Sequence, residues 1–204
     1  YESECKLEWR PQPCKDVDKA GNWLLEISEE DEGALIHLHS YSFVSLNWQK
    51  PVMMVAHGDV DTRWNTLHGE DPPQKEWEEY FHRVKFGMHA ADIVIAPTHA
   101  YLKSLEKVYK KFNRSGYIYN CRDSESFNPR QKEPFLFSMG RLWDEAQNII
   151  VIEEVAQKLT FPVYIAGNYQ QPNGNSNIDA QKAEMLGHLP AKEITAWLGR
   201  ASVF

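Results

Sequence analysis

Residues 123–148, DSESFNPRQKEPFLFSMGRLWDEAQN, decide the fold of this chain. Residues 123–134 are polar, contain two prolines and have no hydrophobic period, which is typical of a linker. Residues 135–139 predict a strand, and Gly140 and Arg141 separate it from a helix expected at 147–158. A new strand–helix pattern therefore begins directly after the linker.

Strands and helices alternate on both sides of that linker. Before it we expect helices at 17–29, 75–91 and 100–109 and strands at 34–38, 52–56, 93–96 and 117–119. After it we expect strands at 135–139, 162–166, 185–189 and 202–204, helices at 147–158 and 191–200, and a polar surface loop at 168–177.

This alternation predicts the fold class α/β with two Rossmann-like domains, residues 1–125 and 126–204. The apolar strands at 34–38 and 52–56 are continuous, which is typical of parallel strands covered on both faces. We expect a ligand cleft at the carboxyl ends of the strands, between the domains. The last predicted strand looks cut short, so both domains are expected to be incomplete.

Composition narrows the functional classes. The 204 residues are 42% hydrophobic and 25% charged, which fits a globular chain and excludes disorder. The net charge of -7 argues against general nucleic-acid binding, because phosphate contacts need an excess of Lys and Arg.

No apolar run reaches the roughly 18–20 residues that span a bilayer. Because residues 1–10 are charged and mixed, we expect no signal peptide there, and the three cysteines have no metal-site spacing. We expect unpaired thiols and a cytoplasmic protein, with peripheral membrane contact left open.

Two sets of residues could carry chemistry. Arg141 follows a strand-end glycine, where its guanidinium and the amides of the next helix could bind a diphosphate. The alternative is a surface arginine that pairs with Asp144 or Glu145.

The second set is a group of histidines at predicted strand ends. His37 and His39 flank Leu38, and His57 ends the next strand. A His-x-His pair at a strand end also occurs in metal hydrolases, with Asp59 or Asp61 as a further ligand here. This pattern leaves a metal-dependent hydrolase open as an alternative function.

Several segments resemble glycosyltransferase family 4, also called glycosyl transferases group 1, in the family's order. They are RVKFGMHAADIVIAPTHAYLKSL (83–105), YIYNCRDSESFNP (117–129), FLFSMGRLWDEAQN (135–148), FPVYIAG (161–167) and LGHLPAKEITAWLGRASVF (186–204). The spelling GRLWDEAQN, with LEW, AGNWLL and HGED upstream, is similar to a bacterial subgroup of that family.

The resemblance implies a retaining glycosyltransferase of the two-Rossmann-domain (GT-B) type. Such an enzyme moves a sugar from a nucleoside-diphosphate sugar to a glycan, lipid or small-molecule acceptor, without a required metal or other cofactor. It places the donor against the second domain and the acceptor against the first. The first strand with its Gly-rich acceptor loop, and the Glu-x7-Glu element, would lie outside the 204 residues, so this fragment alone is expected to be inactive.

The resemblance also implies roles for individual residues. His57 matches the strand-end histidine that contacts the sugar near the reacting carbon. The remaining matches concern the donor: Gly140, Arg141 and Gln147 for its diphosphate, and Asn120, Gly187 and His188 for its nucleotide and sugar. Gln147 stands where the family has a lysine, which leaves a non-catalytic sugar-nucleotide-binding relic as a third reading.

Overall fold

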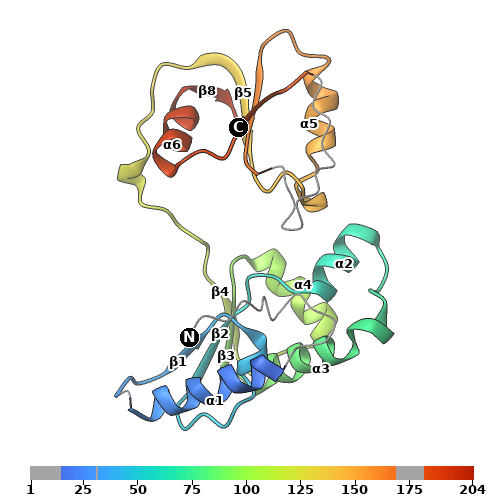
Figure 1. Cartoon of the computed structure of the whole chain (residues 1–204), viewed down its shortest axis with the longest axis vertical. Coiled ribbons are helices and arrows are strands. Elements are labelled where there is room, and N and C mark those ends of the chain that lie inside the picture. Colours follow the sequence, from blue (N-terminus) through green and yellow to red (C-terminus); the bar gives the residue numbers. More distant parts are fainter. Residues whose placement is uncertain (1–14, 31, 169–181) are drawn as a thin grey trace. The chain divides into compact units, whose positions relative to one another are not determined.

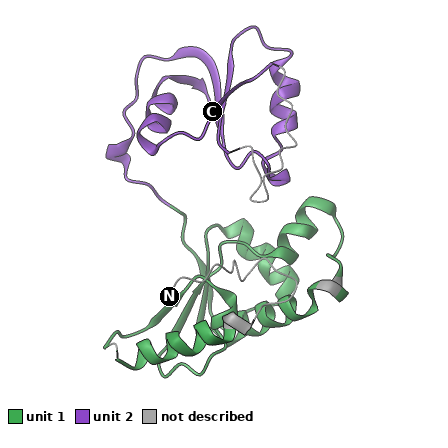
Figure 2. Cartoon of the chain, in the orientation of Figure 1, with its two compact units in different colours: residues 1–120 green, residues 121–204 purple. Residues whose placement is uncertain are grey.

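The computed structural model describes residues 15–30, 32–168 and 182–204. The chain forms two compact units, residues 1–120 and 121–204 (Figure 2). The boundary between these units lies five residues before the predicted domain division after residue 125. Each unit is described by itself below.

The first unit is built on a four-stranded parallel sheet with the order β1-β2-β3-β4 (Figure 1). Its described strands are β1 (Ile36–Leu38), β2 (Val52–Val55), β3 (Ile93–Ala96) and β4 (Ser115–Tyr117). Its described helices are α1 (Lys15–Glu30), the 3-10 helix η2 (Tyr41–Phe43), α2 (Val60–His68), α3 (Gln74–Ala90) and α4 (His99–Tyr109).

The core of this unit lies between its sheet and the apolar faces of α3 and α4. Tyr80, Val84 and Met88 recur at helical spacing on α3 and are buried against the strands. Buried and half-buried residues alternate along β2, so one of its faces is fully covered and the other is covered in part. In β3, by contrast, Val94–Ala96 are all buried.

The second unit contains another four-stranded parallel sheet, with the order β7-β6-β5-β8. Its described strands are β5 (Glu133–Met139), β6 (Val163–Ala166), β7 (Glu184–Gly187) and β8 (Ala201–Val203). Its described helices are α5 (Ile149–Ala156), α6 (Ala191–Arg200) and the 3-10 helices η3 (Ser124–Ser126) and η4 (Glu145–Gln147).

Alternation along β5 divides the core of the second unit into two layers. Phe135 and Phe137 are buried with residues of α6, whereas Leu136 packs with residues of α5. Figure 1 accordingly shows α5 and α6 on opposite sides of this sheet. The sheet therefore has helices on both faces, as parallel sheets in α/β proteins do.

Two helix expectations need correction. The helix expected at 147–158 is divided into η4 and α5, because Asn148 between them adopts a left-handed backbone with φ 47°. Helix α2 was not expected at all. Of the polar loop expected at 168–177, the structure describes only Asn168, which is exposed; the remainder lies outside the described residues. Cys5 and Cys14 also lie outside them, and Cys121 is an exposed free thiol.

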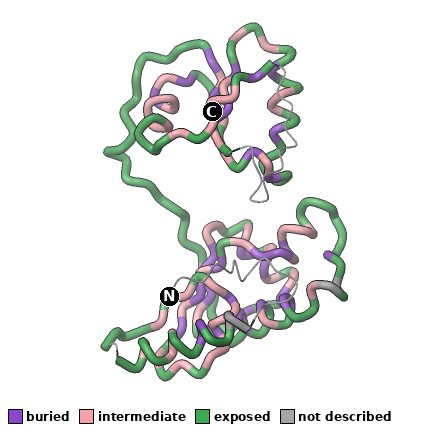
Figure 3. The backbone as a smooth tube through the Cα atoms, viewed as in Figure 1, coloured by how far each residue is buried: buried purple, intermediate pink, exposed green. Residues whose placement is uncertain are grey.

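The stretch that joins the two units is exposed at every residue from 117 to 134 (Figure 3). Its end is attached to the second unit, because the Arg130 amide donates to the carbonyl of Gly199 in α6 over 3.1 Å. Lys132 adds a second bond, from Nζ to the same carbonyl, also over 3.1 Å. Among the described helices, none is long and apolar enough to cross a membrane.

Candidate functional site

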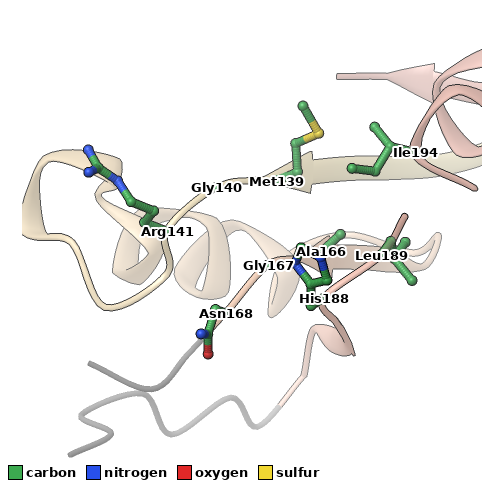
Figure 4. Close-up of a pocket in the computed structure, with 9 residues that line it drawn as sticks. All are labelled: Met139, Gly140, Arg141, Ala166, Gly167, Asn168, His188, Leu189 and Ile194. Carbon is green, nitrogen blue, oxygen red and sulfur yellow. The ribbon is translucent and has the colours of Figure 1, made fainter. Parts of the chain in front are cut away.

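A pocket of about 280 Å³ opens at the carboxyl edge of the second sheet. It lies where β5, β6 and β7 end, which is where α/β proteins bind their ligands. Figure 4 shows its nine lining residues: Met139, Gly140, Arg141, Ala166, Gly167, Asn168, His188, Leu189 and Ile194.

Close backbone contacts hold the strand ends around this pocket. The Gly140 amide donates to the carbonyl of Ala166 over 3.0 Å, and the Gly167 amide donates to the carbonyl of Gly187 over 2.7 Å. Gly167 has a φ of +147°, and a Cβ there would collide with the carbonyl oxygen of Gly140. Only glycine lets these two turns approach so closely.

Arg141 lies at the rim of the pocket, and its side chain is 63% exposed. Its Nη2 lies 3.0 Å from Oδ2 of Asp144, whose side chain is 1% exposed. Figure 4 shows the guanidinium directed away from the part of the pocket where Gly167 and His188 lie. The sequence alternative of an arginine paired with Asp144 is therefore present in the structure, on a residue that also lines the pocket.

Asp144 organises the loop that follows Arg141. Its Oδ1 accepts a hydrogen bond from the Ala146 amide over 3.0 Å, and its own amide donates to the carbonyl of Arg141 over 2.8 Å. Such a side-chain-to-backbone bond makes an Asx turn. The loop therefore has a defined shape, and Arg141 starts from a fixed backbone position.

Gln147 packs on the strand-end glycine. Its Cδ would lie 3.1 Å from a Cβ at Gly140, so the amide group lies directly over that turn. Gln147 itself is exposed. The residue that stands in place of the family's lysine is thus next to Gly140 and Arg141, although it does not line the pocket.

The opposite part of the pocket is formed by the turn after β7. Gly187 adopts a left-handed backbone with φ 69°, and the exposed His188 follows it into the pocket lining. Leu189 and Ile194 add apolar surface. The sequence analysis did not single out three of the lining residues: Asn168, Leu189 and Ile194. For Asn168, the available signal was its position directly after a predicted strand and its glycine.

A second set of polar side chains gathers at the carboxyl edge of the first sheet. Nδ1 of His39 and Nε2 of His57 are 2.7 Å apart and hydrogen-bonded. The ring centroid of His37 lies 4.6 Å from that of His39. The three histidines that the sequence placed at strand ends therefore do lie together.

The carboxylate behind His57 is engaged in the protein interior. Asp59 is completely buried, and its oxygens accept hydrogen bonds from the hydroxyls of Tyr101 (2.7 Å) and Tyr109 (2.6 Å). Its Oδ1 also accepts from the Thr62 amide (2.9 Å), which caps helix α2. The structure does not favour Asp59 as a metal ligand, because its carboxylate is buried and bonded to groups of α2 and α4.

Asp61, the other suggested ligand, lies in the first turn of α2. Burial raises the pKa of its carboxyl to about 6, and the nearby charges of Asp59 and Asp71 add to this shift. Within the described part of the chain, no group of three or more His, Cys, Asp or Glu side chains is arranged to hold a metal ion.

Of the sequence-predicted site residues, the pocket therefore brings together Gly140, Arg141 and His188, with Gly187 and Gln147 adjacent. His57 and Asn120 belong to the first unit, and Asn120 is its last residue. The following residue, Cys121, does not adopt a left-handed backbone.

No protein-family model matches the chain, and no curated protein does. Among solved structures, the chain is similar to sucrose-phosphate synthase from Thermosynechococcus elongatus, with 14% sequence identity and a TM-score of 0.73. The match covers 98% of this chain and 55% of that chain, so the present chain spans about half the length of that structure. This similarity confirms the predicted α/β fold with two Rossmann-like domains.

Proposed function

We propose that this chain is part of a retaining glycosyltransferase of family 4, from its bacterial subgroup. It would move a sugar from a nucleoside-diphosphate sugar to a glycan, lipid or small-molecule acceptor. The observation that carries the proposal is the single pocket that collects Gly140, Arg141 and His188 at the carboxyl edge of the second sheet. The structural similarity to sucrose-phosphate synthase supports the general class of glycosyltransferase.

Arg141 is the residue proposed to bind the donor diphosphate. As the bond from the anomeric carbon to the diphosphate breaks, negative charge grows on the departing phosphate. A guanidinium at the pocket rim stabilises that charge more strongly in the transition state than in the ground state. Loss of one such contact costs on the order of 3 kcal/mol of activation free energy.

The ion pair with Asp144 is compatible with that role. It engages Nη2 of Arg141, and a guanidinium has five N–H donors in all. Because the arginine side chain is 63% exposed, its other donors can reach a phosphate without breaking the pair. A doubly charged phosphate also accepts stronger hydrogen bonds than neutral groups do. Asp144 then restricts the directions that the guanidinium can take.

The acceptor and the sugar are assigned to the first unit. His57 at its sheet edge would orient the transferred sugar through a hydrogen bond, without acting as a covalent nucleophile. In this reaction with retention, His57 would form no covalent bond to the sugar. A phosphate oxygen of the departing diphosphate would take the proton that the acceptor loses. Asn120 would contact the donor from the end of the first unit.

The hydrolase alternative has less support. The oxygens of Asp59 are bonded to two tyrosines, and His39 and His57 are bonded to each other. Each imidazole keeps only one nitrogen outside that bond, and the described part of the chain has no group of three or more His, Cys, Asp or Glu side chains arranged to hold a metal ion. We propose that turnover requires no metal, so EDTA should leave sugar transfer by the complete protein unchanged.

Calorimetry on the complete protein tests the donor site most directly. We expect one of UDP, GDP and ADP to bind, and Arg141→Ala to weaken that binding at least 10-fold, a difference of about 1.4 kcal/mol. Lys132→Ala serves as a control, because Lys132 is a cation of the same unit whose bonds go to the carbonyls of Leu198 and Gly199. Equal binding by wild type and Arg141→Ala would remove Arg141 from the proposal.

Gln147 motivates the reading of a non-catalytic relic, which the same protein can test. A lysine over Gly140 would bring a second cation beside Arg141. If wild type binds a nucleotide without turnover and Gln147→Lys restores transfer, the relic reading holds. If the wild-type protein already releases nucleoside diphosphate from a donor sugar, the transferase reading holds.

A further inference from the structure

His39 and His57 reach each other because two neighbouring strands end at the same edge. Strands β1 and β2 are parallel, with Leu38 opposite Met54. His39 follows β1 directly, and His57 follows β2 after Ala56. Both imidazoles are exposed, and their ring planes differ by 10° with centroids 4.9 Å apart. The fold itself therefore places them at hydrogen-bonding distance.

The hydrogen bond couples the protonation of the two imidazole rings. It joins Nδ1 of His39 to Nε2 of His57 over 2.7 Å, so one of these nitrogens must carry a proton and the other must not. In a neutral imidazole, the state of one nitrogen determines that of the other. While the bond lasts, the tautomers of the two rings are therefore coupled: Nδ1 of His57 is an acceptor if His57 donates from Nε2, and a donor if Nε2 accepts.

His37 limits the freedom of this arrangement from the other side. Its ring lies 4.6 Å from the ring of His39, at an angle of 33° between the planes. Residues 37 and 39 point to the same face of the strand because side chains alternate with a period of two. Packed between His37 and His57, the imidazole of His39 has little room to rotate.

We propose that His39 is a positioning residue that sets the ring orientation and tautomer of His57, so that His57 presents one defined nitrogen to the transferred sugar. The sugar contact rests on the proposed function, whereas the link between the two histidines rests on the hydrogen bond alone. A catalytic hydrogen bond depends on such preorganisation, because a misplaced group loses much of its effect on the barrier.

Asn and Gln offer a matched pair of substitutions for His39. The side-chain amide of Asn lies where Nδ1 of a histidine lies, whereas that of Gln lies where Nε2 lies. Since His39 bonds through Nδ1, His39→Asn should keep the bond to His57 and His39→Gln should lose it. His82→Gln is the control, since it removes an exposed imidazole of α3 in the same unit that takes no part in this bond. Both substituted positions, residues 39 and 82, are exposed, and circular dichroism verifies that each variant folds.

Two measurements on the complete protein test the proposal. Nitrogen-15 NMR at about pH 8.5, where free imidazole is neutral, reports the tautomer of His57. We expect one tautomer in wild type and His82→Gln, and a mixture in His39→Gln. With a donor that is turned over, His39→Gln should lower kcat by roughly 10- to 100-fold with little change in KM for the donor, and His39→Asn should recover most of it.

The outcomes separate this inference from the proposed function. A single His57 tautomer in His39→Gln would overturn the inference, as would a mixture of tautomers with unchanged kcat. If the wild-type protein turns over no nucleoside-diphosphate sugar, the proposed function fails instead. The tautomer of His57 then decides alone whether His39 positions it.

Discussion

At the strand end that carries His57, the carboxylate of Asp59 joins three elements of the first unit. It caps α2, accepts from Tyr101 and Tyr109 of α4, and follows β2 in the chain. Burial, with the carboxylate adding to it, raises the pKa of Tyr109 far above the usual range, so this phenol stays protonated and keeps donating. In the sequence Asp59 resembles a metal ligand, but in the structure its carboxylate stabilises the turn that follows His57.

The neighbouring Asp61 gives a prediction about pH. Its pKa is about 6 in the folded chain, above the ordinary 3.8, because burial and the charges of Asp59 and Asp71 disfavour ionisation. The folded state therefore binds this proton more tightly than the unfolded state. The resulting stabilisation is fully present below about pH 3.8 and is lost as the pH rises through 6. The N-terminus of α2 favours a negative charge by only about 0.3–1 kcal/mol, and it does not reverse this direction.

Asp61→Asn, which cannot ionise, should accordingly raise the melting temperature relative to wild type at pH 7.5. The gain should shrink toward zero near pH 4, and thermal melts across that range measure it. Glu29→Gln, which removes an exposed carboxylate of α1, is the control and should give no such trend. A constant difference at all pH values would contradict the assignment. Asp71→Asn should lower the pKa of Asp61 in an NMR titration, because it removes one repelling charge.

At the scale of elements, Gly199 in α6 determines how the linker attaches to the second unit. A Cβ at this position would lie 2.7 Å from the carbonyl oxygen of Asn128, which is backbone and has no rotamer to change. The Gly199 carbonyl also accepts from the Arg130 amide. The absence of a side chain therefore lets residues 128–132 run close along the end of the helix.

Gly199→Ala should detach this segment. Alanine ordinarily stabilises a helix by about 0.5–1 kcal/mol relative to glycine, but overpacking against backbone costs about 1–3 kcal/mol, so the net effect is destabilising. We expect a lower melting temperature and faster cleavage within residues 121–132 in limited proteolysis. Gly116→Ala in β4 is the control, because a Cβ there meets only Cδ1 of Ile95 at 3.5 Å. Equal cleavage of both variants would refute the close-contact explanation.

Most helices and strands could be predicted from the sequence, because the spacing and run length of apolar residues reflect which residues are buried in the core. Strand β3 and helix α6 begin and end where they were expected, since short apolar runs and a helical period mark both clearly. Helix α2 was missed because few of its residues are buried, although Asp59 and Gly69 mark its two ends as caps. The break at Asn148 could not be predicted, because asparagine tolerates a left-handed backbone without requiring it.

The residues of the candidate site could also be predicted from the sequence only in part. Gly140, Arg141 and His188 follow strands that pair in parallel, so the strand-end rule alone brings them to one edge. The sequence offered Asp144 and Glu145 as partners of Arg141, and the loop geometry selects Asp144; the bond between His39 and His57 needed the register of two strands. These contacts depend on distances of a few ångströms, which no residue pattern specifies.

At the scale of the whole molecule, each unit has its own buried core. The core of the first unit contains residues of β2, β3, α3 and α4, and those of the second contain residues of β5, β6, α5 and α6. The stretch between them is exposed throughout. Each core can therefore be stabilised by a ligand that binds its own unit.

Hydrogen exchange on the complete protein tests this division together with the proposed donor site. A nucleoside diphosphate that binds should slow exchange at the three turns around the pocket, residues 139–142, 166–168 and 187–189, because it covers amides of the second unit. It should leave residues 36–39 and 55–58 unchanged, since a nucleoside diphosphate lacks the transferred sugar that His57 is proposed to contact. The intact donor sugar should add protection at 55–58, as expected if His57 contacts the sugar. Protection at 55–58 by the nucleotide alone would contradict the assignment of His57 to the sugar, and protection confined to the first unit would contradict the donor site itself.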